Sequence, residues 1–228
     1  MIETRGITKS FNSHRVLDKI NLTAETGKCL VVLGPSGIGK TVLLKIMVGL
    51  LQADSGDVYY EGRSLNNMDR KGLSTLRSRM GFVFQSSALF DSMTVFENVA
   101  LRLIEARKPN INAVVDDILS DFNLLEARAL YPGEISGGMK KLVSLARAIV
   151  TNPDYLFYDE PTAGLDPAMR ERITKEMIRL REKVGATSIV VTHDLDVAFK
   201  VGERVLMLKH GRVLEVGSRK EARKHYEE

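Results

Sequence analysis

The residues best suited to chemistry form a glycine-rich run that ends in a lysine and a threonine. The run reads Gly34-Pro-Ser-Gly-Ile-Gly-Lys40-Thr41, and its spacing is that of a P-loop, G-x-x-x-x-G-K-[ST]. In a P-loop the backbone N–H groups cradle phosphate oxygens, the lysine reaches the β- and γ-phosphates, and the threonine hydroxyl binds Mg²⁺. The motif predicts a nucleotide site built from Gly34, Pro35, Ser36, Gly37, Ile38, Gly39, Lys40 and Thr41.

Two elements must position this loop, a strand before it and a helix after it. The apolar, β-branched run Cys29–Leu33 predicts the strand, and residues 41–51 have the apolar spacing of a helix that begins near Lys40. The positive end of that helix dipole would face the phosphates. The alternative is a glycine turn before an ordinary helix, but the strand–loop–helix order favours nucleotide binding.

A pair of carboxylates follows another short strand. Asp159 and Glu160 come directly after the apolar run Tyr155–Tyr158. A carboxylate at the C-terminal end of such a strand points into the crevice where open α/β sheets bind ligands. We therefore expect Asp159 to hold Mg²⁺ and Glu160 to act as general base on the attacking water. Without the P-loop, the same pair would be an ordinary solvated strand end.

Ser136, Gly137 and Gly138 form a second candidate for phosphate binding. They precede a helix expected over residues 140–151, where Ser136 can act as N-cap and the glycines leave backbone N–H groups accessible. Capping alone explains the serine but not the double glycine. Two phosphate cradles in one chain suggest that two copies share each nucleotide, each supplying a different half of the site.

The order of predicted elements favours an α/β fold. Alternating patterns before residue 28 and around residues 56–62 predict antiparallel strands, whereas strands and helices alternate after Tyr155 and predict a mostly parallel sheet. The expected fold class is a P-loop NTPase with a RecA-like core and an N-terminal antiparallel β subdomain. The later elements are expected as helices 167–184, 195–201 and 219–228 and strands 187–191, 205–208 and 213–216.

Residues 86–150 differ in character from the rest, because strand patterns vanish and helical spacing dominates. We expect a helical subdomain inserted into the core, within a single domain that spans residues 1–228. Its first helix should have Thr94 as N-cap and Glu97 completing a capping box. Asn112 is expected to cap the second helix, which runs to Phe122.

Composition limits the class of protein. The chain has 228 residues with 33 basic and 29 acidic side chains, a net charge of +4, which permits a nucleic acid or anionic membrane partner without requiring one. A single cysteine excludes an internal disulfide framework and fits a reducing compartment. We find no signal peptide core at the N-terminus and no apolar run long enough to span a bilayer.

The motifs together resemble the nucleotide-binding subunit of an ABC transporter. Ile135–Met139 occupies the place of that family's LSGGQ signature and Tyr155–Glu160 the place of its Walker B motif, in the family's order and over nearly the whole chain. The resemblance implies a head-to-tail dimer with ATP and Mg²⁺ at the interface, on the cytoplasmic face of the inner membrane. It also implies an integral membrane permease as partner.

The resemblance assigns roles to five further residues. Phe11 takes the place of an aromatic residue that stacks on adenine, with Val16 packed nearby, although a plain core role for Phe11 is a serious alternative. Gln85 resembles the Q-loop glutamine, which touches Mg²⁺ and the attacking water. Asp166 belongs to a D-loop that faces the opposite site, and His193 resembles the switch histidine that contacts the γ-phosphate.

Two details resemble one branch of the family. Met139 stands where most relatives have glutamine, and residues 84–99 resemble the ATPases of Mla and Mce-type phospholipid transport systems, which would add an Mce-type periplasmic partner. An importer of small polar solutes is the alternative within the family. The short charged tail is expected as a solvated helix, with no regulatory C-terminal domain.

Two other classes of protein are disfavoured. A soluble ABC ATPase that acts on nucleic acid would carry a long coiled coil or a second cassette, and we expect no nucleic acid partner. A small-molecule kinase would not require the signature-like glycines at Gly137 and Gly138 or a histidine at position 193.

Overall fold

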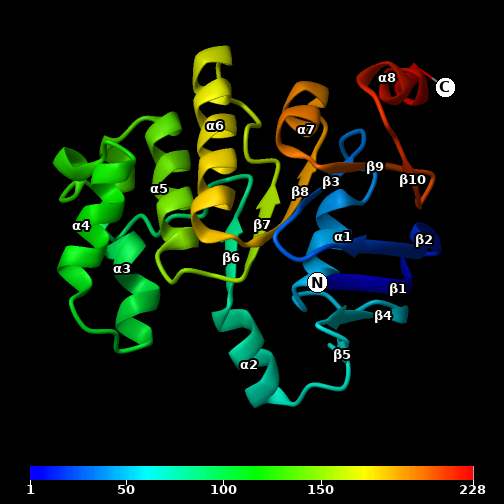
Figure 1. Cartoon of the computed structure of the whole chain (residues 1–228), viewed down its shortest axis with the longest axis horizontal. Helices are drawn as coiled ribbons and strands as arrows, with labels where there is room; N and C mark the ends of the chain where they lie inside the picture. The colour runs from blue at the N-terminus through cyan, green and yellow to red at the C-terminus, as the bar shows by residue number, and fades with distance from the viewer. Residues whose placement is uncertain (228) are drawn as a thin grey trace.

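The computed structural model describes residues 1–227, which form two β-sheets with helices between and around them (Figure 1). The smaller sheet is antiparallel with the strand order β2-β1-β4-β5. Its strands are β1 (Ile2–Phe11), β2 (His14–Ala24), β4 (Ser55–Tyr60) and β5 (Arg63–Ser64). The predicted antiparallel subdomain is therefore confirmed.

The larger sheet has the order β10-β9-β3-β8-β7-β6. Five neighbouring strands are parallel and β10 is antiparallel to β9, because Gly211 adopts a φ of 73° and closes a hairpin between them. The strands are β3 (Cys29–Leu33), β6 (Met80–Val83), β7 (Tyr155–Asp159), β8 (Thr187–Thr192), β9 (Arg204–Lys209) and β10 (Arg212–Glu215).

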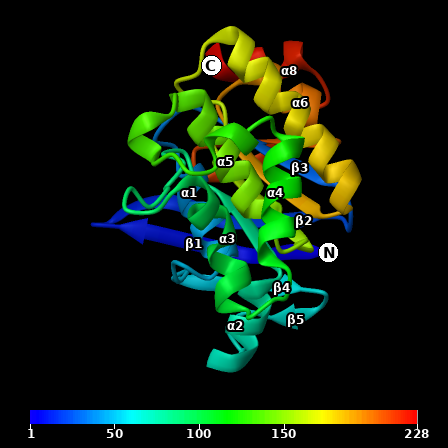
Figure 2. The same cartoon turned by 90° about the vertical axis from the view of Figure 1, so that its left-hand side faces the viewer.

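Helix α1 (Lys40–Met47) lies between the two sheets, and the other helices lie elsewhere around the larger sheet (Figures 1 and 2). The remaining helices are α2 (Arg70–Ser78), α3 (Val95–Glu105), α4 (Ile111–Asp121), α5 (Gly137–Ile149), α6 (Pro167–Val184), α7 (Leu195–Val201) and α8 (Arg219–Glu227), with 3₁₀ turns at Leu125–Ala127 and Pro132–Glu134.

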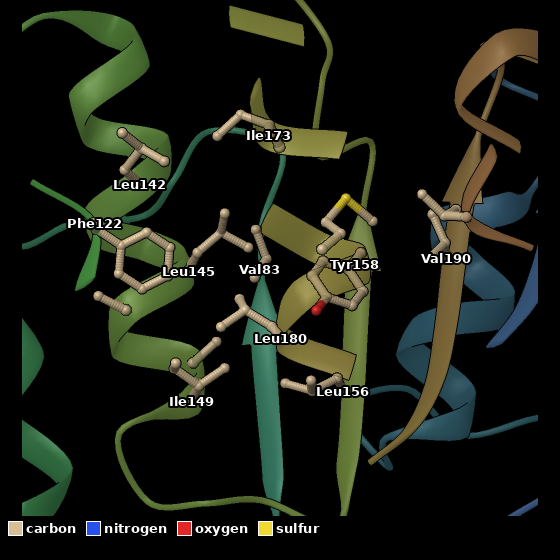
Figure 3. Packing of buried hydrophobic residues seen from close by; sticks show 14 of the residues in the cluster. Val83, Phe122, Leu142, Leu145, Ile149, Leu156, Tyr158, Ile173, Leu180 and Val190 are labelled. Carbon is tan, nitrogen blue, oxygen red and sulfur yellow. The ribbon is translucent and has the colours of Figure 1, made fainter. Parts of the chain in front are cut away.

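Side chains along the buried strands point alternately to the two faces of the larger sheet, and each face carries a hydrophobic core. In β3, Leu30 and Val32 point toward α1 and the smaller sheet, whereas Val31 and Leu33 point to the opposite face. On that opposite face Tyr158 of β7 packs among residues of α5 and α6 (Figure 3). The two hydrophobic layers hold the C-terminal ends of β3, β7 and β8 in fixed register.

Helices α3, α4 and α5 form the helical part of the chain, at the left of Figure 1. Thr94 caps α3, and Glu97 completes the capping box by accepting from the Thr94 N–H at 2.8 Å, as predicted. Phe122, after α4, packs with Leu142 and Leu145 of α5 in the common core (Figure 3). The bounds 86–150 of an inserted subdomain stay a prediction.

Some expected boundaries are wrong. Asn112 does not cap α4, because the helix begins at Ile111 and its N-cap is Asn110, which adopts a left-handed φ of 55°. Helix α1 ends at Met47 rather than near Leu51, since Gly49 turns the chain with a φ of 72°. Among the described residues no helix is both long and apolar enough to cross a bilayer.

Candidate functional site

The P-loop, which joins β3 to α1, requires glycine at two positions for different reasons. Gly39 has a φ of 112°, and a Cβ added there would lie 2.6 Å from Cγ1 of Val16. Gly34 has no such φ, but an added Cβ would lie 2.8 Å from the carbonyl oxygen of Leu208. A larger residue at either position would displace the loop from its place against β2 and β9.

Lys40, the first residue of α1, is only 5% exposed. Its Nζ donates to the carbonyl oxygens of Gly34 at 2.8 Å and Pro35 at 2.9 Å. It also lies 3.0 Å from Oε1 of Glu160. The ammonium is thus held among oxygen atoms at the centre of the loop, where anionic oxygens of a phosphate would meet a fixed positive charge.

Thr41 and Asp159 meet at the same edge of the sheet. Thr41 Oγ1 donates to Asp159 Oδ1 at 2.8 Å. Burial is the largest cause that raises the pKa of Asp159 above its ordinary value, and the neighbouring Glu160 adds to it. The hydrogen bond from Thr41 and the charges of Lys45 and Lys40 oppose this rise, and a bound cation would also lower the pKa of Asp159.

This pair of oxygens fits Mg²⁺. A hydroxyl and a carboxylate are the hard donors that Mg²⁺ prefers, and such ions usually take their other ligands from phosphates and water. Among the described residues no cluster of three or more His, Cys, Asp or Glu side chains could enclose a metal alone. Thr41 and Asp159 would hold the ion together with a nucleotide, and Gln85 lines the same pocket as Thr41.

Glu160 is fixed by the end of β8. Its backbone N–H donates to the Val191 carbonyl at 2.9 Å. Its Oε2 accepts from the His193 N–H at 3.2 Å and lies 2.9 Å from His193 Nδ1. Glu160 also has a φ of 46°, and such a left-handed conformation costs about 1–3 kcal/mol in a non-glycine residue. The surrounding contacts hold this carboxylate in one direction.

One pocket of about 310 Å³ at the C-terminal edge of the larger sheet is lined by Lys40, Thr41 and Glu160, whereas Asp159 does not line it. Its lining comprises Phe11, Val16, Ser36, Gly37, Gly39, Lys40, Thr41, Val42, Gln85, Glu160 and His193. Of the other predicted residues of the P-loop, Ile38 packs against the core between the two sheets. Motif spacing and the family resemblance together thus predicted residues from five separate segments that the fold brings to one place.

Phe11 lies at the mouth of this pocket and is 43% exposed, so the alternative that it is a core residue is wrong. The ammonium of Lys9 lies 5.5 Å from the centre of its ring. An exposed aromatic face beside a phosphate-binding loop is suited to stacking on a planar base. Val16 lies against Gly39 and lines the same pocket as Phe11.

The signature segment lies outside this pocket. Ser136 caps α5 by accepting from the Met139 N–H at 3.2 Å. The two glycines are the first residues of α5, so the helix begins directly after Ser136, the predicted N-cap, rather than at residue 140. A Cβ on Gly138 would lie 2.5 Å from Met169 Cε, whereas Gly137 faces open space. None of the three lines the pocket around Lys40.

Asp166 stabilises the start of α6. It is the N-cap of α6, and its Oδ1 accepts from the N–H groups of Ala168 and Met169, each at 3.0 Å. This helix start packs against Gly138 through Met169. The D-loop and the signature segment are therefore neighbours on one face of the chain.

Known proteins resemble this chain in sequence and in structure. The pattern that defines the family "ABC transporter" matches residues 17–163. The sulfate/thiosulfate import ATP-binding protein CysA of Bordetella bronchiseptica is 40% identical over 226 residues, which cover 96% of this chain and 62% of that protein. The CysA protein of Pectobacterium atrosepticum is 37% identical, with 98% and 68% covered. The chain belongs to the ABC transporter family.

Solved structures of the family have the same fold. A dimeric structure of MJ0796, titled a bacterial ABC transporter cassette, has a TM-score of 0.85 at 33% identity and covers 93% of this chain and 96% of that one. A dimeric post-hydrolysis structure of the same cassette, bound to ADP and Pi, has a TM-score of 0.86 at 32% identity and covers 95% and 98%. The ABC cassette described here is an ATP-hydrolysing enzyme of this class, with the P-loop NTPase fold that the sequence predicted.

The predicted resemblance to Mla and Mce-type systems is not supported by these relatives, which are named as sulfate importers. They favour the alternative of a solute importer. The chain spans 62% of the length of the Bordetella bronchiseptica relative.

Sequence reasoning missed three residues near the site of this ABC cassette. Tyr226 of α8 donates from its hydroxyl to the His193 carbonyl at 3.1 Å, and burial raises its pKa to about 12. Lys141 and Arg147 of α5 bind backbone carbonyls next to Gln85. All three contacts join segments at least 33 residues apart, and the charged α8 gave no local sign of such a contact.

Proposed function

We propose that this ABC cassette is the ATP-hydrolysing subunit of an importer for a small polar solute, and that it works as a head-to-tail dimer. The arrangement of the two phosphate-binding motifs carries the proposed dimer, and the sulfate/thiosulfate importers among the relatives support the importer function. Lys40 and the P-loop line a pocket, while Ser136 and Gly137 are exposed on the same chain and do not line it. A signature motif that cannot complete its own pocket is suited to complete the pocket of a second copy.

In this mechanism each residue of the pocket has one task. Phe11 stacks on the base, and Lys40 with the N–H groups of the P-loop neutralises phosphate charge, which is the main catalytic contribution in phosphoryl transfer. The Glu160 carboxylate accepts a proton from the attacking water. His193 holds Glu160 through two contacts and senses the terminal phosphate, while Gln85 orients the water.

Magnesium, when bound, shields the negative charge of the phosphates and orients them. Thr41 and Asp159 would hold it on the protein side. The protein's own contribution is to keep both oxygens at the mouth of the P-loop, where they now contact each other at 2.8 Å.

The second copy would supply Ser136, Gly137 and Gly138. Ser136 begins a helix of 13 residues, and the start of such a helix presents free N–H groups and the positive end of its dipole to an anion. The absence of a side chain at Gly137 leaves the backbone open to a phosphate. Asp166 lies beside this segment and would face the opposite site.

A membrane subunit is the proposed second partner, and a surface groove supports it. The groove has a volume of about 510 Å³ and lies between the core and the helical part of the chain. It is mostly apolar, and Phe90 is 49% exposed there beside Phe84 and Leu50. Phe84, which lines the groove, directly precedes Gln85 in the sequence. A permease docked in the groove would therefore be coupled to the nucleotide site. We propose on this basis that the cassette works at the cytoplasmic face of the inner membrane.

Lipid transport is the second candidate function. It rests on the resemblance of residues 84–99 to the Mla and Mce-type ATPases and on Met139, which packs against the core instead of offering an amide. An Mce-type periplasmic protein would then be a further partner. Sulfate and thiosulfate importers among the relatives make a small oxyanion the favoured cargo.

Purification of the tagged chain from gently solubilised native membranes tests the proposal. We expect a polytopic membrane subunit to copurify, together with a periplasmic solute-binding protein. Copurified phospholipid and an Mce-type protein would replace the solute importer with the lipid candidate. Recovery from the soluble fraction with RNA or DNA attached would overturn the transporter function while leaving the ATP site intact.

A further inference from the structure

A buried lysine joins the signature helix to the Q-loop backbone. Lys141 lies in the first half of α5 and is only 5% exposed. Its Nζ donates to the Phe84 carbonyl at 3.3 Å and to the Gln85 carbonyl. These two residues follow β6 and precede Lys141 by 57 and 56 positions. One ammonium therefore connects the helix that carries the signature motif with the backbone of the glutamine that lines the nucleotide pocket.

The charge of Lys141 has no obvious structural need. Burial lowers its pKa, and no ion pair of this lysine occurs among the described residues; Asp159 and Glu160 act on it only by longer-range attraction. A buried ammonium that binds neutral carbonyls has a desolvation cost that a neutral donor would avoid. Its two hydrogen bonds to the backbone of Phe84 and Gln85 are what set this cation apart from an ordinary core residue.

A second cation strengthens the same connection two turns along α5. Arg147 donates to the Ser87 carbonyl at 2.8 Å and to the Ala88 carbonyl at 2.7 Å. Ser87 and Ala88 both have left-handed backbones, with φ of 62° and 46°. In this conformation their carbonyls leave the strand direction and turn toward α5. Four carbonyls within residues 84–88 are thus bound by one helix, which fixes the segment to α5.

We propose that Lys141 is a positioning residue for ATP hydrolysis, which ties the Gln85 backbone to α5 so that the Gln85 side chain moves with the signature helix. The inference rests on the proposed role of Gln85 in orienting the attacking water. Lys141 does not line the nucleotide pocket, so it acts through Gln85 and not on the nucleotide. When α5 shifts to meet a second copy, this tie carries Gln85 to its working position.

Steady-state ATPase kinetics of the chain test this connection between Lys141 and the Gln85 backbone. Lys141→Met keeps the length of the side chain and removes its donors. We expect kcat to fall about 10- to 100-fold, since a misplacement of about 1 Å can cost up to about 100-fold, and KM for ATP should change less than about twofold. Lys141→Gln retains an N–H donor and should lose less. Lys175→Met, at a lysine 74% exposed on α6, is the matched control and should retain the parental rate.

A double mutant separates positioning from a plain structural role. In a Gln85→Ala background, Lys141→Met should cause no further loss, because the residue through which it acts is gone. The inference is overturned if Lys141→Met hydrolyses ATP at the parental rate, or if it slows the Gln85→Ala variant by the same factor as the parent. A parental rate for Gln85→Ala alone would instead refute the proposed role of Gln85, and this inference with it. If Lys141→Met fails to fold, Lys141→Gln carries the same cycle.

Discussion

Replacing Glu160 by glutamine separates the chemical step from nucleotide binding. The amide is nearly isosteric with the carboxylate, so it can still accept from the His193 N–H, now at 3.2 Å. It cannot accept the proton of an attacking water at neutral pH. Lys40 loses its 3.0 Å ion pair but keeps the carbonyl oxygens of Gly34 and Pro35. We therefore expect the fold of the P-loop to be retained.

The size of the effect follows from the loss of general base catalysis. A positioned base contributes about 10²- to 10⁴-fold to a rate, which corresponds to about 2.7–5.4 kcal/mol in activation free energy. We expect kcat to fall within that range. ATP affinity should stay equal or rise, because a negative charge next to the phosphates is removed.

The assay combines steady-state hydrolysis with nucleotide binding and size-exclusion chromatography. Glu160→Gln should bind ATP and accumulate as a nucleotide-bound dimer, since hydrolysis would no longer release the two copies. Hydrolysis at the parental rate would show that Glu160 is not the base. Loss of ATP binding would show that the carboxylate is needed to shape the P-loop instead.

Three further predictions concern other parts of the chain. Cys29 is buried and burial raises its pKa to about 12 from 9.0, so the folded thiol should resist a thiol reagent at pH 8 until urea exposes it. Because the folded pKa is raised, the parent should lose stability relative to Cys29→Ala as pH rises above 9. Equal slopes of unfolding free energy against pH for the two proteins would contradict this. Gly81→Ala places a Cβ 2.2 Å from the Ala148 carbonyl oxygen and should lower the free energy of unfolding in urea by about 1–3 kcal/mol. Gly133→Ala, where an added Cβ has nothing within 4 Å, should leave it unchanged. Equal stability of the two variants would be inconsistent with the packing of α5 on β6. Phe11→Ala should weaken ATP binding by about 5- to 10-fold, equivalent to about 1 kcal/mol of lost stacking, with little change in triphosphate binding by calorimetry; a matching loss for triphosphate would remove the stacking role.

Local signals in the sequence predicted most of the fold. Helix α6 begins and ends where predicted, at Pro167 and Val184, because Asp166 caps it and Gly185 ends it in a left-handed conformation with a φ of 67°. The strand that ends at Asp159 was equally evident, since the four residues Tyr155–Tyr158 form a continuous apolar run up to the carboxylate. Such boundaries depend on residues within one or two turns of each other.

Errors arose where two local signals competed. Both Asn110 and Asn112 precede apolar helical spacing, and the side chain of an asparagine favours either an N-cap or a left-handed turn. The chain uses Asn110 in the left-handed conformation without a side-chain cap, so α4 begins earlier than predicted. The outcome depends on how Ile111 packs against the helical core, which no local pattern contains.

The composition of the site was predictable, but its supporting contacts were not. Motif spacing identified Lys40, Asp159 and Glu160 because their chemistry requires those residue types next to a strand or a helix start. Lys141 and Tyr226 instead act through contacts between segments far apart in the sequence. A lysine after a signature motif and a tyrosine in a charged tail are each compatible with many ordinary structural roles until the fold shows which residues they contact.

The central claim is that each ATP site is built from two chains, and a mixture of two inactive variants tests it most directly. Ser136→Arg blocks the signature motif but leaves the P-loop intact, whereas Lys40→Ala does the reverse. Each variant alone should lack ATPase activity. An equimolar mixture should regain activity and form ATP-dependent heterodimers, because one of the two sites in each heterodimer combines an intact P-loop with an intact signature. A mixture no more active than its parts, or full activity of Ser136→Arg alone, would contradict the two-chain site.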